Sequence, residues 1–263
     1  MGYLASVLIG VSLGLIGGGG SILTVPVLVY LFGIEAVPAT GYSLFIVGLT
    51  SAIGSGTYFF KHLVNVRTAI VFGIPSIIAV FAARAWIVPA IPDVVLTVGA
   101  FALTKRILLM VLFAVLMIAA SVSMIRKGTA DTAKQSADPK SFRYGLVVLE
   151  GTVVGVLTGM VGAGGGFLII PALVVLGKLP MKEAVGTSLV IIAAKSLLGF
   201  IGEIGHQEID WLFLLQVSAF AIAGTFIGAA LSRHISGEKL KPAFGWFVLI
   251  IGVYIIVKEL WWD

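Results

Sequence analysis

The chain has 263 residues, of which 59% are hydrophobic and only 11% are charged, and its formal net charge is +5. A soluble domain carries about 25% charged residues, so this composition excludes an ordinary water-facing surface and indicates one that faces lipid. The 17 Lys and Arg residues lie mostly in short segments between apolar blocks, which favours a role in membrane topology over a nucleic-acid partner.

Eight apolar blocks of membrane-spanning length follow one another along the chain. They lie near residues 3–32, 38–60, 68–90, 105–125, 145–177, 184–204, 211–233 and 243–260. The stretch 126–143 is clearly polar and divides the blocks into two sets of four, as an exposed linker would. We therefore predict a first transmembrane repeat over 1–125, a polar cytoplasmic linker over 126–143 and a second transmembrane repeat over 144–263.

The two halves of the chain carry related sequences. At an offset of 145 residues, Gly14–Gly54 aligns with Gly159–Gly199 without a gap, and 16 of the 41 pairs are identical. The identical pairs include Gly17/Gly162, Gly19/Gly164, Gly20/Gly165, Pro26/Pro171, Gly41/Gly186 and Ser43/Ser188. Chance similarity between apolar segments explains these pairs poorly, so we infer an internal duplication, which is common among transporters.

The first block of each half is too long for one straight crossing and is interrupted in the middle. About 30 helical residues would extend ~45 Å, whereas the hydrocarbon layer is ~30 Å thick. The glycine-rich segments Gly17–Gly20 and Gly162–Gly166 disfavour a continuous helix, and a proline follows each of them. We predict two half-helices around each hinge, and we expect both hinges at the centre of the molecule because non-helical backbone does not face lipid.

The basic residues distinguish two topologies. If each long block crosses once, the loop Lys and Arg divide eight against seven, with Arg84 and Lys195 left out as intramembrane. If each long block enters and returns on one side, they divide twelve against three, and the positive-inside rule then places the linker in the cytoplasm. We therefore predict an all-α integral membrane protein whose homologous halves each hold one glycine-broken re-entrant or hairpin segment plus three transmembrane helices. The halves are expected to be inverted repeats.

Helix N-termini at the hinges are candidate anion sites. Unpaired N–H groups and the macrodipole make such an end electropositive, and we expect helices to begin near Ser21 and Gly166. Two further ends are expected at matched hydroxyl tracts, Ala39–Ser43 and Ala184–Ser188. Alternatively, the glycines serve close helix packing and the hydroxyls bond back to the i−4 carbonyl. The predicted substrate-binding residues are Gly17, Gly19, Gly20, Ser21, Gly41, Tyr42, Ser43, Gly162, Gly164, Gly165, Gly166, Gly186, Thr187, Ser188 and Lys195.

Lys195 is the strongest single candidate, because it lies deep inside its apolar segment. An unpaired ammonium at that depth costs several kcal/mol, so a negative group is expected to meet it. Ser188 precedes Lys195 on the same helix face by ~10 Å, which leaves room for an anionic substrate between them. The alternative is a structural ion pair with Glu150 or Glu203. The repeat counterpart of Lys195 is Thr50, so any site here is chemically asymmetric.

Other polar residues lie within or near the apolar blocks. Glu150, Glu203 and His206 are candidates for proton coupling, because ionisable groups in membrane segments often serve proton relays. They and Arg84 can equally extend toward the polar interface. Asn65 and Asp210 occupy matched positions and are expected to cap the helices that follow them.

The sequence contains no catalytic or metal-binding pattern and predicts no cofactor. The glycine tracts lack the G-K-[ST] of a phosphate-binding loop, and the second tract does not complete G-x-G-x-x-G. His62, His206 and His234 are scattered without metal-ligand spacing, and the chain has no cysteine. We therefore expect no enzyme.

The duplicated motif resembles that of a known family. The pattern G-x-x-G-x-G-G-G followed by a proline, and then A-x-G-T/Y-S-L in the next block, is similar to the TauE/SafE sulfite exporter family, also called the 4-toluene sulfonate uptake permease family. The resemblance covers nearly the whole chain. It implies a multi-pass bacterial or archaeal inner-membrane protein that moves sulfite, sulfoacetate or other organosulfonates with an ion gradient. The family motifs fall on Gly162, Gly164, Gly165, Pro171, Gly186, Thr187 and Ser188, and again on Gly17, Gly19, Gly20, Pro26, Gly41 and Ser43.

The sequence and the resemblance together predict a secondary transporter of a small sulfur-containing anion with alternating access. Tyr42 departs from the family pattern at the position of Thr187, which leaves open whether both halves bind substrate equally. The alternative function is a passive anion channel. The expected partners are the anion and the lipid bilayer, with no nucleic acid, and the sequence leaves a homodimer open.

Overall fold

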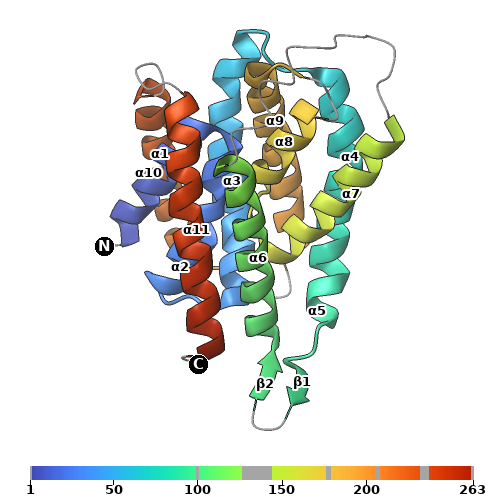
Figure 1. Ribbon diagram of the computed structural model, residues 1–263, viewed down its shortest axis with the longest axis vertical. Coiled ribbons are helices and arrows are strands. Elements are labelled where there is room, and N and C mark those ends of the chain that lie inside the picture. The colour runs from blue at the N-terminus through green and yellow to red at the C-terminus, as the bar shows by residue number, and fades with distance from the viewer. Residues whose placement is uncertain are drawn as a thin grey trace.

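The computed structural model of the chain describes residues 2–98, 101–125, 144–175, 179–204, 208–231 and 237–261. The predicted linker at 126–143 lies outside these residues. Figure 1 shows an elongated bundle of helices with one small hairpin at an end of its long axis. An all-α membrane fold is therefore confirmed for the described part of the chain.

The described elements follow the predicted blocks closely. The first half contains α1 (Gly2–Ile16), the 3₁₀ helix η1 (Gly18–Leu23), α2 (Thr24–Tyr30), α3 (Ala36–Phe60), α4 (Val66–Ala82), the π-helix η2 (Ala83–Ile87), α5 (Val88–Ala90), β1 (Val94–Val98), β2 (Phe101–Thr104) and α6 (Lys105–Ile125). The second half contains α7 (Tyr144–Val161), α8 (Gly166–Val175), α9 (Met181–Ile201), α10 (Trp211–Leu231) and α11 (Gly237–Trp261).

Five helical stretches in the described residues are long and apolar enough to cross a membrane. They are Ala36–Phe60, Val66–Ala90, Lys105–Val122, Lys182–Ile201 and Trp211–Leu231. Their outer faces carry large apolar side chains, and Ile78 and Leu212 are 64% and 70% exposed. Contiguous apolar surface of this kind is stable against lipid and not against water.

The first long block bends back on itself at its glycine hinge. Gly17 has φ 75°, a backbone conformation that other residues rarely adopt. The start of α1 and the chain just beyond α2 lie side by side, since the ring centroids of Tyr3 and Phe32 are 5.5 Å apart. The block therefore begins and ends at the same end of the molecule, which is the re-entrant path favoured by the basic residues.

Two further contacts distinguish the single-crossing topology from the re-entrant one. Gly186, near the start of α9, packs against the backbone of Leu63, and Arg106 pairs with Glu259. If each long block crossed once, the members of each pair would lie on opposite sides of the membrane. These contacts fit re-entrant blocks instead, whereas the inverted orientation of the halves in the membrane stays a prediction.

Packing between the halves follows the offset of 145 residues. α1 packs against α10, and its counterpart α7 packs against α4, the counterpart of α10. α3 packs against its own counterpart α9, and α6 against α11. At the hinges, Gly17 lies against Val185, and Gly162 lies against the backbone of Thr40, the counterpart of Val185. The interface is thus built from equivalent contacts, as expected of a duplicated chain.

Two hydrogen bonds between the halves are also related by the offset of 145 residues. The backbone N–H of Asn65 donates to the hydroxyl of Thr187 at 2.9 Å, and that of Asp210 donates to the hydroxyl of Tyr42 at 2.8 Å. We call these two contacts the cross-half hydrogen bonds. Asn65 and Asp210 also cap the following helices, because their side chains accept from the N–H groups of Thr68 and Phe213 at 3.0 Å. Both predicted caps are confirmed.

Two elements were not predicted from the sequence. The antiparallel pair β1 and β2, with Val98 opposite Phe101, forms the hairpin between α5 and α6. β-Branched residues favour this extended structure, but the apolar helices on either side mask the signal. The π-helix η2 inserts an extra residue into the helix that begins as α4, and its effect on Arg84 is described below.

Candidate anion site

Lys195 belongs to α9, and its side chain reaches across the interior of the bundle to α7. Its side chain is fully buried, and its ammonium donates to the hydroxyl of Thr158 at 2.9 Å. Thr158 is 1% exposed and donates its own hydroxyl hydrogen to the carbonyl of Val154 at 2.7 Å. The lysine therefore meets a neutral acceptor and is closed off from both sides of the membrane.

The ammonium also borders the hinge of the second half. Gly165 has φ 78°, and a side-chain carbon on it would lie 2.7 Å from the Lys195 nitrogen. α8 begins at the next residue, as predicted, and the first N–H groups of a helix lack intrahelical acceptors. A buried cation and the positive end of a helix dipole thus meet at one point, and an anion is the ligand that such a point favours.

The hinges of the two halves meet beside this point. A side-chain carbon on Gly164 would contact Val47 and would lie 3.3 Å from Ser21 Cβ and 3.4 Å from Ile192. Ser21 belongs to η1, which packs against α8. In the first half, however, α2 begins at Thr24 and not near Ser21, because the glycine-rich segment forms the tighter 3₁₀ turn first. The two hinges therefore differ in local structure.

The carboxylates weighed as partners for Lys195 lie elsewhere. Glu203 pairs with Arg84 at 3.0 Å, and one buried oxygen of Glu150 has no hydrogen-bond partner. Within the described ranges no carboxylate pairs with Lys195. The predicted alternative of a structural ion pair to Lys195 is therefore wrong for Glu203 and is not observed for Glu150.

The hydroxyl tracts do not form the additional helix ends that we expected. α3 and α9 begin at Ala36 and Met181, so both tracts lie inside helices. Tyr42 and Thr187 serve the cross-half hydrogen bonds, and Ser188 donates to the carbonyl of Val185 at 2.8 Å. Ser188 thus bonds back into its own helix and does not meet Lys195.

Other predicted residues have mixed surroundings. The Ser43 hydroxyl is buried without a hydrogen-bond partner. Gly41 and Gly186 are buried inside α3 and α9, which agrees with the alternative of close helix packing, and their predicted role in substrate binding stays a prediction. Gly19 and Gly20 belong to η1, and His206 lies outside the described residues.

Sequence reasoning missed Thr158 and a matched pair of serines. Ser51 directly follows Thr50, and Ser196 directly follows Lys195, so the two serines are equivalent positions of the repeat. Both hydroxyls are buried without a hydrogen-bond partner in the described residues. The same residue type at both equivalent positions could have marked these serines as candidates from the sequence alone. Thr158 offered a weaker one, since it is a polar residue four positions before the Gly162 hinge and its repeat counterpart is Leu13.

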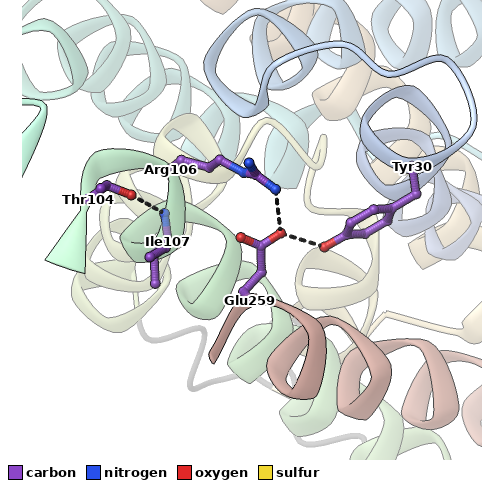
Figure 2. A network of polar contacts seen from close by, with 5 residues as sticks. All are labelled: Tyr30, Thr104, Arg106, Ile107 and Glu259. Atoms are coloured by element: carbon purple, nitrogen blue, oxygen red, sulfur yellow. Dashed lines mark hydrogen bonds and ion pairs between the residues drawn. The ribbon is translucent and has the colours of Figure 1, made fainter. Parts of the chain in front are cut away.

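A second polar cluster lies at the hairpin end of the bundle (Figure 2). The buried carboxylate of Glu259 accepts from the Tyr30 hydroxyl at 2.9 Å and pairs with Arg106 at 3.5 Å. These residues join α2, α6 and α11. The cluster therefore fixes the outer end of α2, the half-helix that follows the first hinge, about two turns beyond the hinge region.

A bundle of long apolar helices around a glycine-hinged and positively charged centre defines a multi-pass membrane transporter. A sequence model of the family described as "Sulfite exporter TauE/SafE" matches residues 3–255, and the chain belongs to this family. It is thus a transporter of the cell membrane, and its family is one of transporters and not of enzymes.

Curated relatives agree with this class. The chain is 29% identical to a "Probable membrane transporter protein" of Xylella fastidiosa strain Temecula1, and the alignment covers 96% of this chain and 92% of the relative. It is 26% identical to "Probable membrane transporter protein YunE" of Bacillus subtilis, with 99% of both chains covered. No solved structure matches the chain.

Proposed function

We propose that the chain is a secondary transporter of a small sulfur-containing anion, such as sulfite, sulfoacetate or another organosulfonate, and that it works by alternating access. The observation that carries this proposal is the buried Lys195 ammonium, which is bonded to a hydroxyl and borders the start of α8. A charge buried in this way is costly unless an opposite charge meets it. A compact oxyanion supplies that charge and several acceptor oxygens for N–H groups.

The fold supports alternating access in two ways. The candidate site is closed, since both Lys195 and Thr158 are buried, so an anion reaches it only when the halves move. Each half also carries a glycine hinge beside the site, at which a half-helix can change direction at low steric cost. Rocking of one half against the other would open the site to each side in turn.

Lys195→Gln tests the binding site. We expect sulfite to stabilise the wild-type protein in a thermal-shift assay and to lose this effect in the variant, with uptake into proteoliposomes reduced at least about tenfold, because a charge-assisted hydrogen bond is removed. Lys258→Gln is the matched control, since Lys258 lies over the Tyr30 ring at the far end of α11. An unchanged sulfite affinity in Lys195→Gln would reject the site. A parallel screen with sulfate, thiosulfate, sulfoacetate, taurine and simple carboxylates identifies the preferred anion.

The alternative of a passive anion channel requires no coupling ion and no closed centre. Initial flux that saturates with sulfite and responds to a pH gradient supports the transporter, and non-saturating flux that ignores the gradient supports the channel. We propose Glu150 as the proton carrier, because one of its buried oxygens has no partner, whereas Glu203 is already paired. Glu150→Gln should abolish the response to the gradient, and a retained response would exclude this role.

A further inference from the structure

Arg84 and Glu203 form a buried ion pair toward the hairpin end of the bundle, on the side where α4 packs against α7 and α9. The Arg84 Nη1 donates to the Glu203 carboxylate at 3.0 Å, and the two side chains are 0% and 4% exposed. Sequence analysis allowed both residues to extend toward the polar interface, but the structure buries them. The partners are 119 positions apart in the chain, so no local sequence pattern predicts the pair.

The guanidinium has more donors than the pair uses. An arginine side chain presents five N–H donors in a planar fork, and the Nε and Nη2 groups of Arg84 are buried without a hydrogen-bond acceptor in the described residues. Unpaired buried donors on a charged group are costly. The π-helix η2 carries Arg84 at its second position, and such insertions are frequent at functional sites.

This fork lies close to the Lys195 site. Glu203 lies two residues beyond the end of α9 and eight after Lys195, or about 12 Å at the helical rise. A side-chain carbon placed on Gly159, the neighbour of Thr158, would lie 2.9 Å from Ala83 Cβ. Gly202 in turn lies against Arg84, with 3.3 Å between the Arg84 Cβ and a carbon placed on the glycine. A continuous line of packed residues therefore joins the two buried cations.

We propose that Arg84 is a second binding site for the same class of sulfur oxyanion, on the path between Lys195 and the hairpin end of the molecule. This inference rests on the proposed function. The free side of the fork presents donors that match two oxygens of a sulfite or sulfonate group. Glu203 competes with the anion and holds Arg84 in place when the second site is empty.

Glu203→Gln distinguishes this role from a purely structural ion pair. The amide keeps the shape of the side chain and removes the competing charge. Titration of sulfite into the purified variant at constant ionic strength should give a dissociation constant for the second site about tenfold lower than in the wild type. A structural pair predicts a less stable protein with unchanged sulfite binding, and so does a guanidinium whose spare donors bind only water. Either result would overturn the inference.

The Lys195→Gln background separates this inference from the proposed function. In Lys195→Gln the tighter sulfite binding should be lost and only the weaker Arg84 site should remain. Binding should tighten about tenfold in Lys195→Gln/Glu203→Gln and should be lost when Arg84→Gln is added. A sulfite affinity in Lys195→Gln equal to that of the wild type contradicts the proposed function, whereas a double variant that binds sulfite no more tightly than Lys195→Gln contradicts the second site. If the double variant does not fold, Arg84→Lys keeps the ion pair but loses the fork. A sulfite KM for uptake raised about tenfold at unchanged thermal stability then supports the second site, and an unchanged KM opposes it.

Discussion

One charged residue makes the centre of a duplicated protein asymmetric. Lys195 and Thr50 occupy equivalent positions, yet the threonine bonds back to the carbonyl of Ile46 at 2.7 Å, whereas the lysine bonds across to Thr158. Thr158 has no polar counterpart, since Leu13 stands in its place. The charge and its acceptor therefore both lie in the second half, and the candidate anion site lies beside the second hinge.

Thr158→Val should make the protein depend more on its anion. Valine keeps the shape of threonine but removes the acceptor of the Lys195 ammonium, so stability without anion should fall by about 1–3 kcal/mol. Saturating sulfite should restore most of this loss, because the oxyanion replaces the missing acceptor. Thermal unfolding with and without sulfite measures both effects, with Thr158→Ser as the control. A loss that sulfite does not restore would show that the threonine is only structural.

The hinges are the elements that bring the site together. Their position was predictable, because consecutive glycines interrupt an apolar block that is too long to cross once. The start of α8 at Gly166 was also predicted, whereas η1 delays the matching helix to Thr24. The hairpin and η2 were missed, since neither changes the apolar character of the sequence. The burial of Arg84 was missed because its partner lies in the other half of the chain.

Gly165→Ala should disable the second hinge. The residue has a positive φ, and the added methyl would collide with Thr158 and lie 2.7 Å from the Lys195 nitrogen. Strain of this kind costs about 1–3 kcal/mol, and the collision should add loss of sulfite binding. Gly33→Ala is the matched control, because Gly33 also has a positive φ, at 71°, but nothing lies within 4 Å of the added carbon. Equal losses of sulfite binding in the two variants would contradict a steric role for the hinge.

At the scale of the molecule, equivalent contacts join the halves on both sides of the centre. The repeat and its offset were visible in the sequence, and the contacts between α1 and α10 and between α7 and α4 follow that offset. The pairing of the helices was not visible, because periodicity shows that a helix has a buried face but not which helix covers it. Asn65 and Asp210 illustrate the difference. Their caps were predicted, whereas their bonds to Thr187 and Tyr42 required the fold.

Cysteine labelling tests the orientation in the membrane. The chain has no cysteine, so Lys61→Cys and Asp93→Cys each introduce a single exposed thiol, beyond α3 and beside the hairpin respectively. The positive-inside rule places Lys61 in the cytoplasm and Asp93 outside. A membrane-impermeant maleimide should therefore label Asp93→Cys in intact cells and Lys61→Cys only after permeabilisation. The reverse pattern would invert the predicted topology.

The cross-half hydrogen bonds give this architecture two fixed points. Tyr42 lies near the start of α3 and Asn65 just beyond its end, so the bonds are separated by most of a 25-residue helix, or roughly 30 Å. A swing that parts the halves at one end strains the bond there and leaves the other intact. Each bond then holds the halves together at its own end while the halves separate at the other end. In the proposed alternating-access mechanism, the relative strengths of the two bonds would set the side of the membrane to which the empty protein opens.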